Sequence, residues 1–313
     1  MIGPLPHNVS ALPYHCAMSK PILFEPVESP YLVGFDGEFK IAKAPTAPTD
    51  AAPDKHANQE GLAHAVARLA KLQGRLYADD RFSMLLVFQA MDAAGKDGTI
   101  KAVLSGVNPQ GCQVSSFKSP SATELDHDFL WRIQRELPER GRIGIFNRSH
   151  YEEVLVVRVN PDFLAAQRLP RAPKHLDALW EERMESIVEA ERHWARNGCA
   201  ILKFFLHVSR KEQHKRFLAR ITDPDDNWKF SAGDWAESAK WDAYMAAYQA
   251  ALRATSKAWA PWYAIPADDK PFMRRTVAEI VVNTLARLPL EYPKPTDNER
   301  VAMDAIRRKL EAE

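Results

Sequence analysis

Residues 93–99 form a loop of small side chains that could hold a phosphate group. They are Ala93, Ala94, Gly95, Lys96, Asp97, Gly98 and Thr99, and a helical stretch is expected from about Thr99 to Ser105. In such a loop several backbone N–H groups point to one spot, and the dipole of the following helix adds partial positive charge there. Lys96 can contact a phosphate oxygen as a point charge, and Thr99 offers a hydroxyl to a magnesium ion or a phosphate.

The loop matches the GxxxxGK[ST] pattern only in part, so a plain connector between a strand and a helix is the alternative. Ala90 stands at the first glycine position, and the hydroxyl comes three residues after Lys96. Asp92 favours the phosphate site, because a carboxylate beside bound phosphate is costly unless a cation lies between them. We therefore expect Asp92 to hold magnesium or to accept a proton.

A second group of polar residues, Asn147 to Glu153, follows another apolar run. The fixed fork of donors on Arg148 suits the charge that spreads over a transferring phosphoryl group. His150 could act as a base, but transfer to a phosphate acceptor requires no proton removal, so a structural role in the turn is favoured.

The segment 210–229 holds six basic and four acidic residues and is expected to lie in a lid that closes over substrate. Arg216 and Arg220 are i,i+4 neighbours on one helix face and could clamp phosphates together. A solvated charged helix is the alternative. The aromatic residues of the lid are interpreted as packing residues rather than as base-stacking platforms. They are Trp228, Trp235, Trp241 and Tyr244.

The elements that position these residues alternate between strands and helices. Short apolar runs predict five strands, at residues 83–90, 113–117, 143–147, 201–208 and 262–266. Helices are expected at about 60–79, 121–137, 174–196 and 234–256. This alternation predicts an α/β fold with a five-stranded parallel sheet flanked by helices, whose ligands bind at the carboxyl ends of the strands.

Several ordered motifs together resemble the polyphosphate kinase 2 family over about residues 30–290. They are DAAGKDGTIK, NPQGC, FLWRI, FNRSHYEEVLVVRV, DP..NWKF..GDW and APWYAIP. The RSHYEE form, with asparagine before the arginine, is similar to the class III subgroup, which phosphorylates both AMP and ADP from polyphosphate. The resemblance implies a P-loop kinase fold with a helical lid, similar to thymidylate kinases, and implies Mg²⁺ as cofactor.

The residue patterns and the resemblance together give expected roles for individual residues. The expected catalytic residues are Asp92, Lys96, Arg148, Arg216 and Arg220, with Asp92 as the metal ligand. Residues 93–99 with Lys101 and Lys229 are expected to bind phosphate, and Asn147 and Glu152 to bind the nucleotide. Lys118, Arg132 and Arg135 are hypothetical linings of a polyphosphate channel. Asp226 departs from the family pattern, which has lysine there, and could weaken a contact with the polyanion.

The sequence favours three parts: a proline-rich N-terminal arm (1–55), a kinase core (56–290) with an inserted lid at about 210–245, and a C-terminal helical tail (291–313). Nine of the 22 prolines fall in residues 1–53. Such an arm either lies on the surface or is partly disordered, or it grips another subunit. The family resemblance suggests a homodimer or homotetramer.

Composition excludes several classes of protein. With 42 basic and 41 acidic residues, the formal charge of +1 gives no overall field to attract nucleic acid. The longest purely aliphatic or aromatic run, Met84 to Phe88, is far shorter than the roughly 20 residues that span a bilayer. The three cysteines lack metal-ligand spacing, and the N-terminus lacks the basic region of a signal peptide, so a cytoplasmic protein is expected.

Three functions therefore compete. The first is transfer of a phosphoryl group from inorganic polyphosphate to AMP and ADP, giving ADP and ATP. The second is an ATP-dependent kinase for a small molecule or nucleotide on the same fold, which the fold alone does not distinguish. The third is a P-loop protein that binds nucleotide without turnover. Incubation with AMP, magnesium and polyphosphate in the absence of ATP separates the first from the others.

Overall fold

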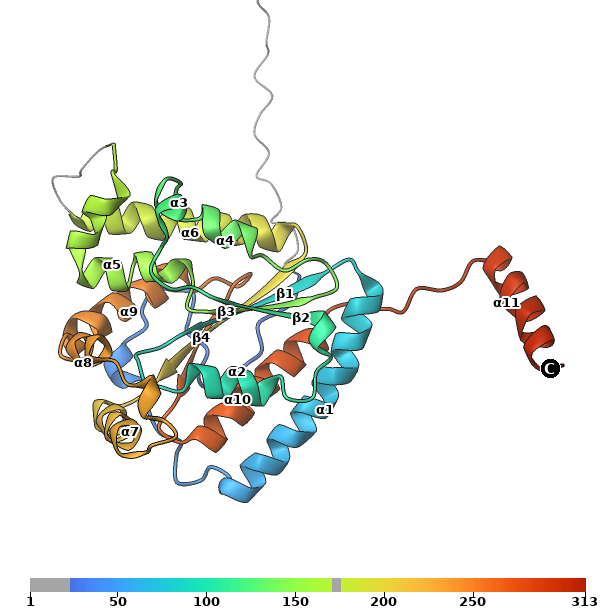
Figure 1. The fold of residues 1–313 in the computed structure, drawn as a ribbon, viewed down its shortest axis with the longest axis horizontal. Helices are drawn as coiled ribbons and strands as arrows, with labels where there is room; N and C mark the ends of the chain where they lie inside the picture. Colours follow the sequence, from blue (N-terminus) through green and yellow to red (C-terminus); the bar gives the residue numbers. More distant parts are fainter. Residues whose placement is uncertain (1–22, 171–175) are drawn as a thin grey trace, which may run out of the picture.

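The computed structural model describes residues 23–170 and 176–313, and its centre is a five-stranded parallel sheet (Figure 1). The strands lie in the order β2-β3-β1-β4-β5. Their bounds are β1 Ser83–Gln89, β2 Cys112–Ser116, β3 Ile143–Asn147, β4 Cys199–His207 and β5 Trp262–Pro266. The predicted fold class is confirmed, and each strand lies within two residues of its predicted position.

The three central strands carry the apolar core. Every residue of β1 and β4 is buried, as expected for strands covered by helices on both faces. Chain connections between parallel strands pass through helices, which form the two covering layers. Strand β2 at the edge is more exposed, and the side chain of Val114 is half exposed there.

Two helical layers cover the sheet (Figure 1). One holds α1 (Lys55–Asp79), α2 (Lys96–Val103) and α10 (Lys270–Leu285), which pack on one another. The other holds α5 (Val156–Val159), α6 (Leu176–Arg196) and α9 (Trp241–Thr255). The shorter elements are α3 (Ala122–Leu125), α4 (Trp131–Arg135), η1 (Ile41–Lys43), η2 (Pro109–Gly111), η3 (His150–Glu153) and η4 (Pro161–Gln167).

Two expected helices are each interrupted. The stretch 121–137 forms α3 and α4, because the side chain of Asp128 accepts from the backbone N–H of Leu130 and makes a local turn between them. The stretch 234–256 forms α8 (Ala232–Ser238) and α9, and α8, capped by Ser231, begins two residues before the expected start. Helix α6 begins at Leu176, and residues 174–175 of its expected range lie outside the described residues.

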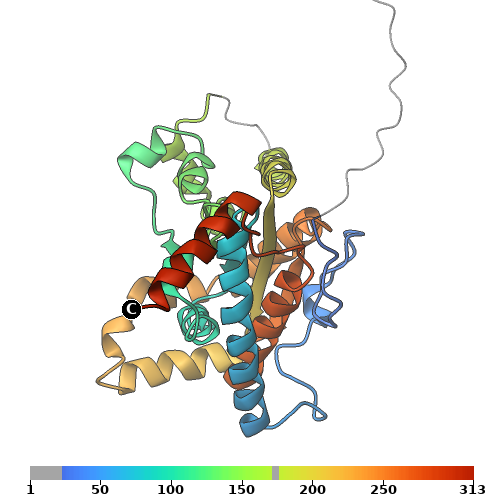
Figure 2. The ribbon, with the colours of Figure 1, turned by 90° about the vertical axis from the view of Figure 1, so that its right-hand side faces the viewer.

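Residues 23–53, the described part of the N-terminal segment, pack against the core of the same chain along one side of the molecule (Figure 2). Leu32 forms an antiparallel bridge with Tyr263 of β5, and Val33 N donates to Trp262 O at 2.9 Å. Phe24 and Val27 are buried against the core. This part of the segment thus forms a single bridge that covers the edge of β5.

The lid region follows β4 and consists of α7 (Arg210–Thr222), η5 (Asn227–Lys229) and α8. At the other end of the chain, α11 (Asp297–Leu310) stands apart from the body, and all of its residues are exposed (Figure 1). None of the helices in the described residues is long and apolar enough to cross a membrane.

Candidate functional site

A cavity of about 780 Å³ lies at the carboxyl ends of β1, β2 and β3, and residues of α7 and α10 also line it. The connection from β1 leads toward β2, whereas β4 and β5 lie on the other side of β1, so the strand order reverses there. Such a reversal opens a crevice at the strand ends. Its lining includes Asp92–Gly98, Ser116–Ser119, Asn147, Arg148, Arg216, Arg220, Asp226, Lys229, Asp234, Lys270 and Arg274.

The phosphate loop connects the centre of the sheet to α2. Gly95 caps α2 with φ 105°, a left-handed conformation that a residue without Cβ adopts freely, and Ala93 has φ 63°. The Lys96 ammonium donates to Ala90 O at 2.8 Å, and burial lowers its pKa. Thr99 is fully buried and donates to Gly95 O at 2.9 Å, so its hydroxyl holds the helix rather than lining the cavity.

Arg148 begins the turn after β3 and faces the phosphate loop. Its guanidinium Nη2 donates to Asp92 Oδ1 at 2.9 Å, and Nη1 lies 3.9 Å from Glu152 Oε2. Glu152 lies behind Arg148, and burial raises the pKa of its carboxyl group. Asn147 donates to Asp97 Oδ1 at 2.6 Å. The structure thus brings together the residues predicted from the first two motifs, although Glu152 contacts Arg148 rather than the cavity.

Arg216 comes from the lid helix α7, and its guanidinium is fully engaged. Its Nε donates to Glu212, its Nη1 to the carbonyls of residues 93–94, and its Nη2 to those of residues 267–268. These bonds occupy all five N–H donors of an arginine. In this arrangement Arg216 ties α7 to the phosphate loop and to the end of β5, and the predicted phosphate contact requires it to exchange some of these bonds.

Arg220 lies one turn further along α7 and lines the cavity, with its guanidinium 5.9 Å from the ring centroid of Phe217. Lys229 also lines the cavity, but its ammonium bonds Asp226 at 2.5 Å. Asp226, which departs from the family pattern, therefore pairs with Lys229, a residue predicted to bind phosphate. The exposed ring of Trp228 lies 5.2 Å from the same ammonium.

Two cations that the sequence reasoning missed, Lys270 and Arg274, extend the cavity along α10. The guanidinium of Arg274 approaches the phosphate loop at Gly98. Burial, followed by the charges of Arg216 and Arg274, lowers the pKa of Lys270. Both residues follow the carboxyl end of β5, and the rule that ligands bind at strand ends could have identified them from the sequence. The crowding of like charges shows that this end of the cavity suits a polyanion.

The predicted channel residues take different positions. Lys118 lines the main cavity, but Arg132 is buried and donates to Lys118 O at 2.8 Å. Arg135 stacks on Trp131 and lines, with Arg132, a neighbouring hollow of about 420 Å³. Lys101 lies exposed in the last turn of α2, outside the cavity lining.

The acidic residues of the cavity fit a divalent cation held jointly by protein and phosphate. Burial and the nearby charge of Asp92 raise the pKa of Asp234, so these two carboxylates repel each other across the cavity. Among the described residues no group of three or more His, Cys, Asp or Glu side chains could hold a metal alone. One or two carboxylates completed by substrate phosphates is the usual arrangement for Mg²⁺.

Residues 52–292 match the family model described as Polyphosphate kinase 2. The chain belongs to this family. The match covers the sheet, both helical layers and the lid region. The family expected from the sequence motifs is therefore confirmed, together with phosphotransferase chemistry.

Known relatives support this membership of the polyphosphate kinase 2 family. The "ADP-polyphosphate phosphotransferase" of Rhodopseudomonas palustris is 51% identical over 280 residues, covering 90% of this chain and 97% of that protein. The "AMP/ADP-polyphosphate phosphotransferase" of Meiothermus ruber is 44% identical, covering 88% and 99%. The crystal structure of Polyphosphate Kinase 2 from Arthrobacter aurescens TC1 is 36% identical, with a TM-score of 0.77 over 90% of this chain and 99% of that one.

Proposed function

We propose that this chain transfers the terminal phosphoryl group of inorganic polyphosphate to AMP and ADP, giving ADP and ATP. The observation that supports the polyphosphate donor is the row of cations that continues from the phosphate loop onto α7 and α10. A nucleoside triphosphate has a fixed, short phosphate chain, whereas this row extends to Lys270 and Arg274. The names of the two relatives described above agree with a polyphosphate donor.

The charges of the site account for the chemistry. Donor and acceptor phosphates repel each other and react only when their atoms approach to about 3–3.5 Å. Lys96 in the phosphate loop and Arg148 beside the loop would neutralise the group in transfer, while Arg220 approaches from the lid. Asp92 orients the Arg148 guanidinium through their 2.9 Å contact, which fixes its donors before substrate binds.

The proposed cofactor is Mg²⁺, with Asp92 as its protein ligand and Asp234 facing the same space. When bound, the ion would neutralise phosphate charge and align donor with acceptor. Binding would also relieve the repulsion between the two carboxylates. The homo-oligomer and the cytoplasmic location expected from the sequence stay predictions.

The proposed function is tested by incubating the purified chain with AMP, Mg²⁺ and polyphosphate in the absence of ATP. We expect ADP to appear first and ATP to follow. A parallel reaction with ATP in place of polyphosphate serves as control. Product formed only in the ATP reaction would contradict the proposal and support an ATP-dependent kinase, and binding without product in either would support a nucleotide-binding protein.

The choice of acceptor is a separate question, because the printed names of the two relatives differ. The Rhodopseudomonas palustris protein is named for ADP alone, and the Meiothermus ruber protein for AMP and ADP. We expect both acceptors to react here. ATP formed from ADP, with AMP left unchanged, would restrict the proposal to ADP.

The cations of α10 give a prediction for donor binding. Lys270→Ala combined with Arg274→Ala is expected to raise the KM for polyphosphate at least about tenfold, because one charge-assisted hydrogen bond contributes about 1.5–3 kcal/mol. The KM for the nucleotide should stay unchanged. The control removes the same charge from exposed α11, with Arg308→Ala and Lys309→Ala. An equal rise in that control would show a general charge effect and contradict the assignment.

A further inference from the structure

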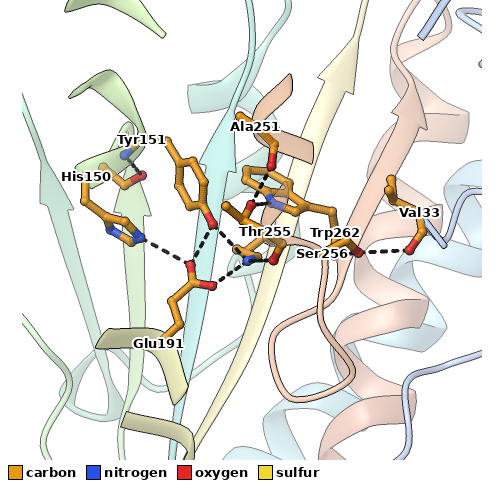
Figure 3. Close-up of polar contacts among 10 residues, drawn as sticks. Val33, His150, Tyr151, Glu191, Ala251, Thr255, Ser256 and Trp262 are labelled. Atoms are coloured by element: carbon orange, nitrogen blue, oxygen red, sulfur yellow. Dashed lines mark hydrogen bonds and ion pairs between the residues drawn. The ribbon is translucent and has the colours of Figure 1, made fainter. Parts of the chain in front are cut away.

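A fully buried polar cluster lies behind the turn that carries Arg148 (Figure 3). We call it the buried anchor, and it consists of His150, Tyr151, Glu191, Lys203 and Thr255. His150 and Tyr151 belong to η3, Glu191 to α6, Lys203 to the middle of β4, and Thr255 to the end of α9. The side chains of the first four residues and the backbone carbonyl of Thr255 therefore join the turn after β3 to a strand and to two helices.

The lysine of the buried anchor uses all of its hydrogen-bonding capacity. The Lys203 ammonium donates to Glu191 Oε2 at 2.5 Å, to Tyr151 OH at 2.9 Å and to Thr255 O at 2.8 Å. An ammonium has three N–H donors, so none is left over. Burial lowers the pKa of Lys203 to about 8. Strand β4 thus holds a charged group that solvent does not reach.

Glu191 receives the two side chains of the turn. Tyr151 OH donates to Glu191 Oε1 at 2.9 Å, and His150 Nε2 lies 3.2 Å from the same oxygen. Burial lowers the pKa of His150, which keeps the imidazole neutral, so its Nε2–H is the donor in this contact. The Tyr151 ring also packs edge-on against Trp262, with centroids 4.8 Å apart. The turn is therefore fixed to the interior by two adjacent side chains.

Stability alone gives no reason for this arrangement. Taking an ion pair out of water costs free energy, and well-packed apolar residues of similar volume are often as stable or more so. The position of Lys203 suits an apolar residue, since all residues of β4 apart from Lys203 and His207 are apolar. His150 Nδ1 has no partner among the described residues, but the donors of Lys203 and Tyr151 are all used. A buried network of this kind specifies one geometry for the segments that it joins.

The turn on the other side of the buried anchor requires such a restraint. Arg148 has φ 62°, a left-handed conformation that costs a residue with a side chain free energy and persists only where its surroundings fix it. Arg148 N donates to Phe88 O at 3.1 Å, and Ser149 Oγ accepts from Gln89 at 3.1 Å. These contacts fix the start of the turn to β1, and the buried anchor fixes its end.

We propose that the buried anchor positions Arg148 for phosphoryl transfer by holding the turn after β3 in its left-handed conformation. This inference rests on the proposed function. Its members are positioning residues, because they act through Arg148 and do not line the cavity. The side chain of Arg148 loses its alignment with the phosphate loop when the turn is released, while the cavity keeps its cations for substrate binding.

The test compares two tyrosines that each lose one buried hydroxyl. Tyr151→Phe removes the bond to Glu191 and the bond from Lys203. Tyr263→Phe, in β5, removes the 3.0 Å bond to Val27 O. Both side chains are fully buried, and we expect the larger decrease in Tm in Tyr151→Phe, because its hydroxyl bonds two charged groups and the hydroxyl of Tyr263 bonds one carbonyl. We expect kcat to fall about tenfold in Tyr151→Phe alone, with both KM values within twofold, since small misplacements of a catalytic group cost up to ~100-fold.

A second pair of variants separates the acceptor from the charges. Glu191→Gln with Lys203→Met removes both charges but keeps a side-chain oxygen that can accept from Tyr151 and His150, whereas Glu191→Leu with Lys203→Met removes that oxygen as well. We expect kcat to stay within threefold of wild type in the first variant and to fall at least tenfold in the second. Circular dichroism on both checks that they fold.

The outcomes are distinct. A Tyr151→Phe enzyme with the same kcat as Tyr263→Phe overturns the positioning role while wild type remains active. Equal kcat in the two double variants, both folded, overturns it as well. A wild-type chain without transfer from polyphosphate would instead contradict the proposed function itself.

Discussion

Replacing Arg148 with alanine is expected to lower kcat by about 10³–10⁵, the range seen when an arginine that stabilises a transferring phosphoryl group is lost. The variant leaves Asp92 and Glu152 without their cation at 2.9 and 3.9 Å, so two carboxylates would then face the incoming phosphates. The measurement is the initial rate of ATP formation from ADP and polyphosphate at saturating substrates.

Two variants control this prediction. Arg142→Ala removes an arginine just before β3, where it pairs with Glu139 on the surface, and should leave kcat within twofold. Arg148→Lys keeps the charge but loses the fork of donors, and we expect it to recover only a small part of the rate. If Arg148→Ala kept more than half of the wild-type turnover, the assignment of Arg148 would be wrong.

Replacing Lys96 with methionine is expected to lower kcat by about 10²–10³, the effect of removing one preorganised donor from a developing negative charge. Methionine keeps the length of the side chain and fills its half-buried position, so the loop should remain folded. The loss should be larger than in a fully solvated site, because burial strengthens the interaction of a charge with its partners.

The pH dependence of the wild type adds a check on Lys96. Burial lowers the pKa of its ammonium, so the charged form is lost at a lower pH than in a free lysine, and kcat should decline on the alkaline side. That decline should be absent from the residual activity of Lys96→Met. The exposed lysine of α1 serves as a control: Lys71→Met should match wild type in kcat and in pH profile. A Lys96→Met enzyme with unchanged kcat would show that the loop does not act on the transferring group.

The sequence predicted those parts of the molecule that depend on local pattern. Runs such as Met84–Phe88 and Ile143–Phe146 are apolar throughout, and only a strand covered on both faces buries every one of their side chains. The rule that ligands bind at strand ends then placed Lys96 and Arg148 at one edge, and the structure brings them into one cavity. Both helices that were predicted too long contain a capping residue or a local turn that periodicity does not detect.

Contacts between distant segments were not predictable in the same way. Lys203 follows an apolar run, and the sequence does not indicate its partners. Glu191 neutralises its charge, and Tyr151, which lies 52 residues away, accepts one of its hydrogen bonds. Arg216 looks like a phosphate ligand by type and spacing, and only the positions of five acceptors show how its donors are used. The pairing of Lys229 with Asp226 is local, but it depends on the short helix η5, which carries Lys229 and was not predicted from the sequence.

The bridge between Leu32 and Tyr263 joins parts of the chain that leave the ribosome early and late. The segment with Phe24 and Val27 is synthesised first, yet the edge on which it docks does not exist until β5 has been made. Throughout most of translation these apolar side chains remain uncovered, as does the outer edge of β4, which β5 pairs with. A nascent chain of this protein should therefore bind chaperones until its last strand emerges, and products truncated before Trp262 should aggregate.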